Sequence, residues 1–240
     1  MAEPAASTAY MGQEALSYDE NRFATPGGRR VHQIEHRNLQ YALRQIDPAG
    51  RVLEVGCGTG RLLMEARADG YHVDGLDASP DMIELVKRKI DDKCADLQLY
   101  VAEAAQLPID DDTYDLTYSV RMLNQTESPD YAKRAIAEMV RVTKPGGLVL
   151  FEFINVFRPR FGPGKRRTTR LKPAEAIVAG TAVGANLLRC YGAMALGISM
   201  YRRVPAVLIP VVYLLDRPLT LLLPRLCARV YVLMRKADGI

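Results

Sequence analysis

The 240-residue sequence predicts an α/β fold built around a mostly parallel sheet. Short apolar runs of strand length alternate with segments of helical spacing from about residue 38 to residue 155. The first run, Val52 to Val55, passes through a glycine-rich turn into a helix, as the first strand of a β–α–β unit does. Hydrophobic residues make up 48% and charged residues 25%, which excludes a fibre or a disordered chain.

The glycine-rich turn spans Gly56 to Gly60 and follows the acid Glu54. Glycines allow unusual backbone angles and leave room for a ligand to approach the chain closely. The spacing is GxGxG. The dinucleotide fingerprint GxGxxG would place its last glycine at position 61, where this chain has Arg61. An acid before so compact a turn suits a ligand with a positive amino group and no pyrophosphate. The next predicted strand ends at Asp77, and this combination indicates an adenosyl cofactor.

The following elements are predicted in order. Ser79 and Pro80 form a helix start, an N-cap followed by a first-turn proline, before apolar residues at helical spacing. A third strand over residues 97–101 leads to Glu103 and Ala104. Residues 112–120 are typical of a fourth strand, and residues 138–150 of a helix, a tight turn and a fifth strand.

These segments resemble, in order and spacing, the motifs of the class I methyltransferases that use S-adenosylmethionine. The resemblance covers roughly residues 38–155 and implies a doubly wound, Rossmann-like sheet of seven strands, mostly parallel with the last strand antiparallel. It divides the chain into an N-terminal helical lid (1–37), a cofactor-binding core (38–157) and a C-terminal part of the same domain (158–240). The sixth strand is expected near 186–196 and the seventh near 228–235, with an apolar insertion at 198–224 between them.

The resemblance also implies which residues hold S-adenosylmethionine. Asp77 would accept hydrogen bonds from both ribose hydroxyls, and Glu103, where the family usually has Asp, would bond the adenine amino group. The lid, with Tyr10, Tyr18 and Arg22, would fold over the methionine end. The full set expected at the cofactor is Glu54, Gly56, Cys57, Gly58, Gly60, Asp77, Ala78, Met82, Glu103, Ala104, Ser119, Tyr18 and Arg22.

The acceptor is expected beside the end of the fourth strand, because open α/β sheets bind ligands at the carboxyl ends of their strands. Ser119, Arg121 and Asn124 are the candidates there. Arg121 would orient an acidic substrate or, alternatively, pair with the acidic residues 110–112. Methyl transfer depends mainly on alignment, so the sequence leaves O-, N- and C-methylation open.

His32 and His36 lie four residues apart in a helix predicted from about Arg29 to Ile46. Their spacing is that of metal ligands, but no third ligand is evident, and no metal site is predicted. Each histidine is either a half-exposed helix residue or a substrate contact or general base at the mouth of the site.

The net charge of +4 hides an asymmetry, since residues 158–240 contain 15 Lys or Arg and three acids. A basic loop over residues 158–170 precedes the apolar insertion. The longest apolar run there, residues 204–215, is too short to span a bilayer, and Pro205 and Pro210 interrupt it. The insertion would form a wall for a small apolar acceptor, or a hairpin that packs on the sheet or forms a dimer interface. The basic region would be a solvated face, or would bind anionic lipid or an anionic apolar substrate. Nucleic acid is disfavoured, because aromatic residues are not interleaved with the basic ones.

The four cysteines, Cys57, Cys94, Cys190 and Cys227, are widely spaced, which indicates reduced thiols and a cytoplasmic protein. The first residues have neither the basic nor the apolar region of a signal peptide, so none is expected. Two alternatives to a cytoplasmic enzyme for a small acceptor stay open. One is a peripheral membrane methyltransferase that modifies lipids, and the other is a cofactor-binding module without activity.

Overall fold

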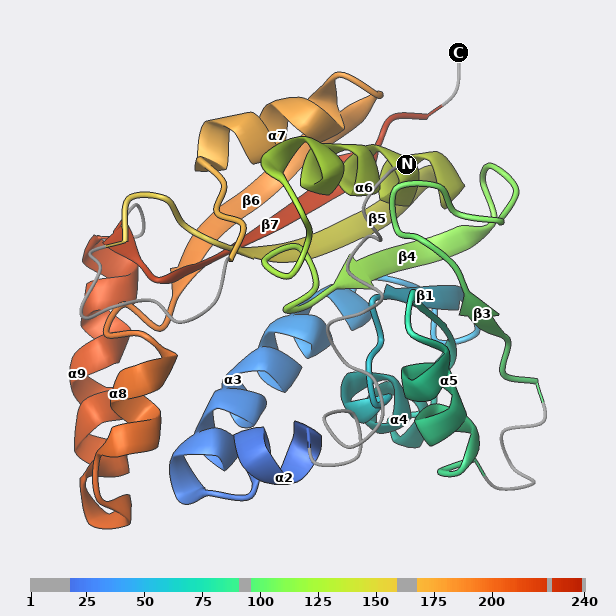
Figure 1. The fold of residues 1–240 in the computed structure, drawn as a ribbon. Helices are drawn as coiled ribbons and strands as arrows, with labels where there is room; N and C mark the ends of the chain where they lie inside the picture. Colours follow the sequence, from blue (N-terminus) through green and yellow to red (C-terminus); the bar gives the residue numbers. More distant parts are fainter. Residues whose placement is uncertain (1–17, 91–95, 159–167, 224–225, 239–240) are drawn as a thin grey trace.

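The computed structural model describes residues 18–90, 96–158, 168–223 and 226–238, and it contains one seven-stranded sheet (Figure 1). The strand order is β3-β2-β1-β4-β5-β7-β6. β7 runs antiparallel to both of its neighbours, whereas the other pairs are parallel, which confirms the predicted fold class. The strands are β1 (Arg51–Val55), β2 (His72–Asp77), β3 (Leu99–Val101), β4 (Tyr114–Ser119), β5 (Thr143–Ile154), β6 (Ala185–Ala193) and β7 (Arg229–Lys236).

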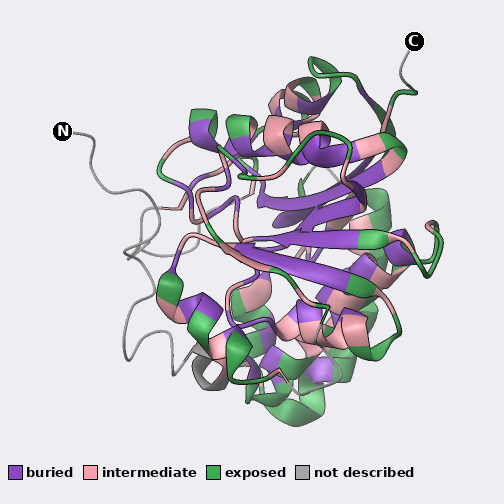
Figure 2. Cartoon of the chain, turned by 90° about the vertical axis from the view of Figure 1, so that its right-hand side faces the viewer, coloured by how far each residue is buried: buried purple, intermediate pink, exposed green. Residues whose placement is uncertain are grey.

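Helices cover both faces of the sheet, and each face has its own apolar core (Figures 1 and 2). Helices α3 (Pro26–Leu43), α4 (Arg61–Ala68) and α5 (Pro80–Lys87) lie on one face, and α6 (Pro129–Val142) and α7 (Pro173–Thr181) lie on the other. Successive strand residues point to opposite faces, so Val52 belongs to the first core and Leu53 to the second. Most strand residues are therefore buried, as Figure 2 shows.

The N-terminal helices are α2 (Tyr18–Phe23) and α3, and α3 begins earlier than the sequence predicts, at Pro26 rather than Arg29. Thr25 is its N-cap, because the Thr25 hydroxyl accepts a hydrogen bond from the Gly28 amide at 3.0 Å. Gly27 does not break the helix. A Cβ there would overlap the backbone carbonyl of Tyr201, so this glycine permits close contact with another helix.

The insertion between β6 and β7 is a helical hairpin that lies beside α3 and the sheet edge (Figure 1). It consists of α8 (Ile198–Arg203), the short 3₁₀ segment η3 (Ala206–Leu208) and α9 (Ile209–Leu222). Asp216 of α9 holds the hairpin together. Its carboxylate accepts hydrogen bonds from the Tyr201 hydroxyl of α8 at 2.7 Å and from the Leu196 amide at 2.8 Å. Across the described residues, no helix combines the length and the apolarity that a membrane span needs.

Candidate cofactor and acceptor site

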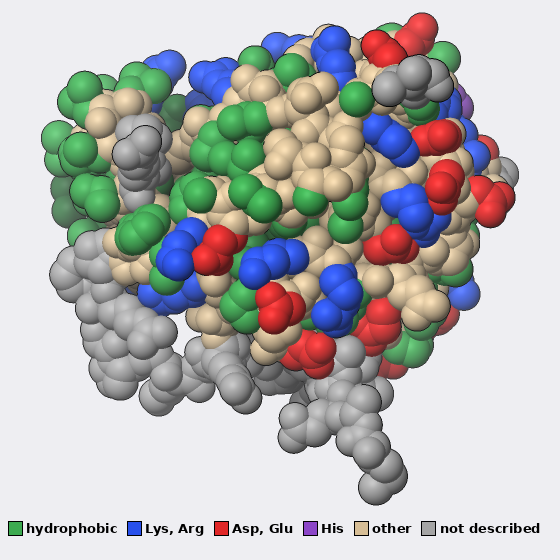
Figure 3. Space-filling view, turned by 90° about the horizontal axis from the view of Figure 1, so that it is seen from above, with side chains coloured by type: hydrophobic (Ala, Val, Ile, Leu, Met, Phe, Trp, Pro, Cys, Tyr) green, Lys and Arg blue, Asp and Glu red, His purple; other side chains and the backbone are tan. Residues whose placement is uncertain are grey.

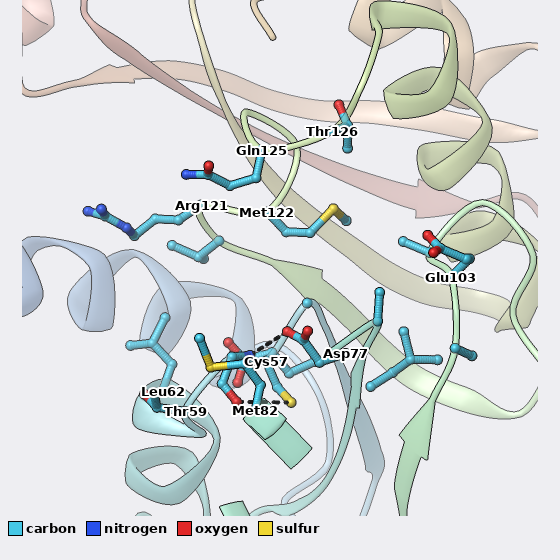
Figure 4. A pocket seen from close by; sticks show the side chains of 18 of the residues that line it. Cys57, Thr59, Leu62, Asp77, Met82, Glu103, Arg121, Met122, Gln125 and Thr126 are labelled. Atoms are coloured by element: carbon cyan, nitrogen blue, oxygen red, sulfur yellow. Dashed lines mark hydrogen bonds between the residues drawn. The ribbon is translucent and has the colours of Figure 1, made fainter. Parts of the chain in front are cut away.

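A cavity of about 880 Å³, including its open mouth, lies at the carboxyl ends of β1, β2 and β4 (Figure 4). Its wall combines the turn after β1, the end of β2, the segment after β3, the loop after β4 and the start of α6. The described lining residues are Glu54, Gly56, Cys57, Gly58, Thr59, Arg61, Leu62, Leu76, Asp77, Ala78, Met82, Ala102, Glu103, Ala104, Val120, Arg121, Met122, Gln125, Thr126 and Tyr131. Most of the residues expected at the cofactor therefore lie together in one place.

The glycine-rich turn forms one wall of the cavity, with Gly56 at φ 77° and Gly58 at φ 55°, in the left-handed region. A Cβ at Gly56 would overlap the Met122 side chain. A Cβ at Gly58 would have no protein atom within 4 Å, because Gly58 borders the open cavity. The turn thus exposes bare backbone to whatever occupies this space.

Asp77 ends β2 and is fixed against this turn. One carboxylate oxygen accepts from the Gly58 amide at 2.8 Å, and the other accepts from the Ser79 amide at 2.9 Å. Burial raises the pKa of Asp77, although these amide bonds oppose the shift. Each oxygen has a second lone pair, so the carboxylate can still accept from two hydroxyl groups of a ligand.

Glu54 lies deeper, with 3% of its surface exposed. It accepts a hydrogen bond from the Tyr118 hydroxyl at 3.0 Å. Burial, with the nearby charges of Asp77 and Glu35, raises the pKa of Glu54 to about 8, so the carboxyl binds a proton at neutral pH. A cationic group bound beside Glu54 would offset this cost. An ammonium group therefore fits this end of the cavity.

Glu103, Ala104 and Tyr131 form another part of the cavity wall. The Tyr131 hydroxyl donates a hydrogen bond to one Glu103 oxygen and orients the carboxylate. In Figure 4, Glu103, in the segment after β3, and Asp77, at the end of β2, border the same space. Glu54, Asp77 and Glu103 thus contribute three carboxyl groups to the lining of one cavity.

Arg121 lies just after β4 and has a left-handed backbone, with φ 70°. Its amide donates to Glu152 at 2.9 Å, which holds this unfavourable conformation in place. Its guanidinium group lies 3.3 Å from Glu35 and 5.5 Å from the centre of the Phe23 ring. The expected alternative pairing with residues 110–112 is wrong, because Arg141 pairs with Asp111 and Lys236 pairs with Asp112.

The other predicted residues lie outside the described cavity lining. His32 Nε2 is 2.5 Å from Glu65 and His36 Nε2 is 3.1 Å from Asp69, so both histidines face α4. The Ser119 hydroxyl is buried and donates to the Val55 carbonyl at 2.8 Å. Asn124 is also buried, and its side-chain oxygen accepts from Arg229.

The lid residues have mixed outcomes. Arg22 belongs to α2 and is not among the cavity residues. Tyr10 and the Tyr18 side chain fall outside the described residues, as do Cys94 and most of the basic loop.

Helix α2 is connected to the glycine-rich turn through Asp19, Thr59 and Lys89, which the sequence analysis did not select. The Thr59 hydroxyl donates to Asp19 at 2.8 Å, and Lys89 contacts Asp19 at 3.1 Å and the Thr59 carbonyl at 2.7 Å. The sequence analysis also missed Met122, Gln125 and Thr126 in the loop after β4. The strand-end argument that selected Arg121 would have found them if it had been extended over the whole loop.

The insertion does not roof the cavity, since none of its described residues lines it. Tyr201 and Ile209 instead pack into the core on the α3 side of the sheet. Of the two expectations for this segment, the hairpin that packs on the sheet is the one observed. Partial burial lowers the pKa of the Arg202 guanidinium group in the hairpin, and the charges of Arg22 and Arg121 lower it further.

Comparisons with known proteins agree with this arrangement. Residues 52–147 match the family model of a methyltransferase domain. A demethylmenaquinone methyltransferase of Renibacterium salmoninarum is 39% identical over 118 residues, which are 48% of this chain and 45% of that protein. The ubiquinone/menaquinone biosynthesis C-methyltransferase UbiE of Citrifermentans bemidjiense is 32% identical over 163 residues, 64% of this chain and 65% of the relative. The chain thus spans less than two thirds of the length of these relatives.

Solved structures are similar at the level of the fold. A putative sarcosine dimethylglycine methyltransferase from Galdieria sulphuraria superimposes with a TM-score of 0.65 at 19% identity, covering 89% of each chain. The CcbJ methyltransferase from Streptomyces caelestis superimposes with a TM-score of 0.61 at 16% identity, covering 85% of this chain and 90% of that one. The strand order, the glycine-rich turn and the match over residues 52–147 together show that the chain carries a methyltransferase domain, folded as in the class I enzymes that use S-adenosylmethionine.

Proposed function

We propose that this protein transfers a methyl group from S-adenosylmethionine to a small, apolar acceptor that carries an acidic end. The observation that supports this proposal most directly is the composition of the cavity. It joins the acidic groups Glu54 and Asp77 to Arg121 and to the apolar side chains of Val120 and Met122. One half suits the cofactor, and the other half suits an anionic group attached to an apolar body.

When bound, S-adenosylmethionine supplies a methyl group already activated by its sulfonium sulfur. The residues of this chain then need only bind and align. Glu54 would hold the ammonium group, Asp77 the ribose hydroxyls and Glu103 the adenine amino group. Arg121 would hold the acidic end of the acceptor, so that its nucleophilic atom lies opposite the departing sulfur, in a site that excludes competing water.

The names of the relatives do not select one acceptor. Some are named for demethylmenaquinone, and another, from Buchnera aphidicola, is a malonyl-[acyl-carrier protein] O-methyltransferase. Carbon and oxygen methylation both occur among these names. The proposal for this chain therefore rests on the charge and apolarity of its own cavity.

The direct test uses S-adenosylmethionine with a labelled methyl group, the full chain and a small-molecule extract of cells. Label should move into material that partitions into an organic solvent at low pH and returns to water at high pH, as an apolar acid does. Label in protein, in nucleic acid or only in neutral products would contradict the proposed acceptor. Cofactor binding without any transfer would support a binding module instead.

Arg121→Gln tests the assigned anionic end. It should lower kcat/KM for the acidic acceptor by about 10- to 100-fold, as expected when one charge-assisted bond is lost. The affinity for S-adenosylmethionine should stay the same, because Glu54 and Asp77 lie on other strands. A variant that retains the parental kcat/KM would reduce Arg121 to a structural partner of Glu35.

A further inference from the structure

The outward side of η3 and α9 in the hairpin exposes a series of large apolar side chains. Leu214 and Leu221 on α9 are 71% and 73% exposed. Figure 3 shows hydrophobic side chains gathered at the left-hand edge of the molecule, where the hairpin lies. The exposed apolar residues of η3 and α9, here called the α9 face, are Val207, Leu208, Val211, Leu214, Leu215, Leu221 and Leu222.

The members of the α9 face recur at helical spacing, at intervals of three, four or seven residues, so these side chains form one stripe. The fifteen steps from Val207 to Leu222, at about 1.5 Å each, give a stripe of roughly 20 Å. The opposite side of α9 carries the groups that attach it to the rest of the molecule, among them Ile209, Tyr213 and Asp216. A surface helix normally turns its polar side outward, whereas the outward side of α9 is apolar. Soluble monomers rarely expose so continuous an apolar surface, and it marks a contact site.

The charges around the α9 face have one sign. Asp216 is the only acid between Glu175 and Asp238 in the sequence, and it is buried inside the hairpin. Arg202, Arg203 and Arg217 of the hairpin are exposed. Arg30 and Arg37 of α3 contact the opposite side of α9, at 4.0 Å and 5.7 Å from the centre of the Tyr213 ring, and add to the positive charge around the hairpin. An apolar stripe bordered by guanidinium groups, without exposed acids, matches an anionic lipid surface.

We propose that the α9 face docks on an anionic membrane, with α9 lying in the plane of the lipid head groups. The 14-residue helix contains Pro218 and the buried Asp216, and no described helix can span a bilayer, so it would lie on the membrane and not cross it. A second copy of the chain fits less well, because two α9 faces would oppose their arginines with no acid between them. Docking is independent of the proposed reaction.

Flotation of the full chain with vesicles tests the proposal. The protein should float with vesicles of phosphatidylcholine and phosphatidylglycerol, less at high salt, and stay in solution with phosphatidylcholine alone. The double substitution Leu214→Gln and Leu221→Gln should lower partitioning by at least about tenfold, because two inserting leucines are lost. Val178→Gln is the matched control: Val178 is 61% exposed but lies on α7, and its variant should float like the parent.

A second measurement does not depend on loss of binding. The chain has no tryptophan, so Leu221→Trp supplies a single reporter in the α9 face. Its emission should shift to shorter wavelength when phosphatidylglycerol vesicles are added, whereas that of Val178→Trp should not change.

The proposal fails if the parent does not float with phosphatidylglycerol vesicles, or if the Gln double variant floats as well as the parent. It also fails if the Leu221→Trp emission is unaffected by lipid. A dimer in light scattering that the Gln double variant makes monomeric, without lipid binding by the parent, would assign the α9 face to self-association instead.

Discussion

Glu54, which we propose binds the ammonium group of the cofactor, lowers the stability of the free protein. Its carboxyl is buried, and its pKa is raised to about 8 from an ordinary value near 4.5. Between these two values the folded state binds more protons than the unfolded state. Stability from this group is therefore present at low pH and falls as the pH rises toward 8.

We expect Glu54→Gln to stabilise the free protein at pH 8 by a few kcal/mol relative to the parent, and to change its stability little below about pH 5. The amide can donate to the Tyr118 hydroxyl and carries no charge that must be buried. The same variant should bind S-adenosylmethionine more weakly, since the ammonium group loses its counter-charge. Urea denaturation at both pH values and calorimetric titration measure the two effects. A less stable variant at pH 8 would contradict the assignment.

Substitutions at Gly58 and Gly184 can distinguish the effect of backbone strain from the effect of ligand contact. Both have positive φ, 55° and 86°, and a Cβ at either position would have no protein atom within 4 Å. Gly58 borders the cavity, whereas Gly184 precedes β6. Gly58→Ala and Gly184→Ala should therefore each cost about 1–2 kcal/mol of stability through the left-handed backbone. Only Gly58→Ala should weaken binding of S-adenosylmethionine in calorimetry. Equal affinities would show that the cofactor does not approach this turn closely.

At the scale of the elements, Asp19 joins α2 to the glycine-rich turn, and we expect this link to govern access to the cavity. The Asp19 carboxylate accepts a hydrogen bond from the Thr59 hydroxyl and forms an ion pair with Lys89, and its side chain is 36% exposed. Asp19→Ala should change global stability by less than about 1 kcal/mol, because exposed pairs contribute little. It should speed hydrogen exchange of residues 18–23 and raise the off-rate of S-adenosylmethionine several-fold, by releasing α2 from the turn. Asp130→Ala, which removes the exposed pair with Lys133 on α6, is the control and should alter neither rate.

Elements fixed by local sequence were predictable, and contacts across the chain were not. The strands around residues 52–55 and 72–77, and the turn between β1 and α4, follow from apolar runs and glycine spacing. The start of α3 was misplaced, because Gly27 looks like a helix breaker until the carbonyl of Tyr201 lies against it. The partner of Arg121 is Glu35, 86 residues away, and no short-range pattern indicates that pairing. The sequence also does not indicate which side of α9 faces inward, because both sides of the helix are apolar.

At the scale of the whole molecule, the last strand is linked to the acceptor end of the cavity through buried charges. Arg229 of β7 donates to Glu152 of β5 at 2.7 Å and to Asn124 at 2.9 Å. Glu152 in turn accepts from the Arg121 amide. The Arg229 and Glu152 side chains are only 6% and 1% exposed. The antiparallel insertion of β7 thus completes the sheet and also supports the strained backbone of Arg121.

Arg229→Met would leave the Glu152 carboxylate buried without its cation. Removing one partner of a buried pair costs about 3–5 kcal/mol, so the variant should be much less stable in urea. Arg235→Met, on the exposed end of the same strand, should cost less than about 0.5 kcal/mol. Adding Glu152→Gln to Arg229→Met should recover part of the loss, because it removes the orphaned charge and keeps an oxygen for the Arg121 amide. If Arg229→Met unfolds at the same urea concentration as Arg235→Met, the ion pair is not what fixes β7 in the sheet.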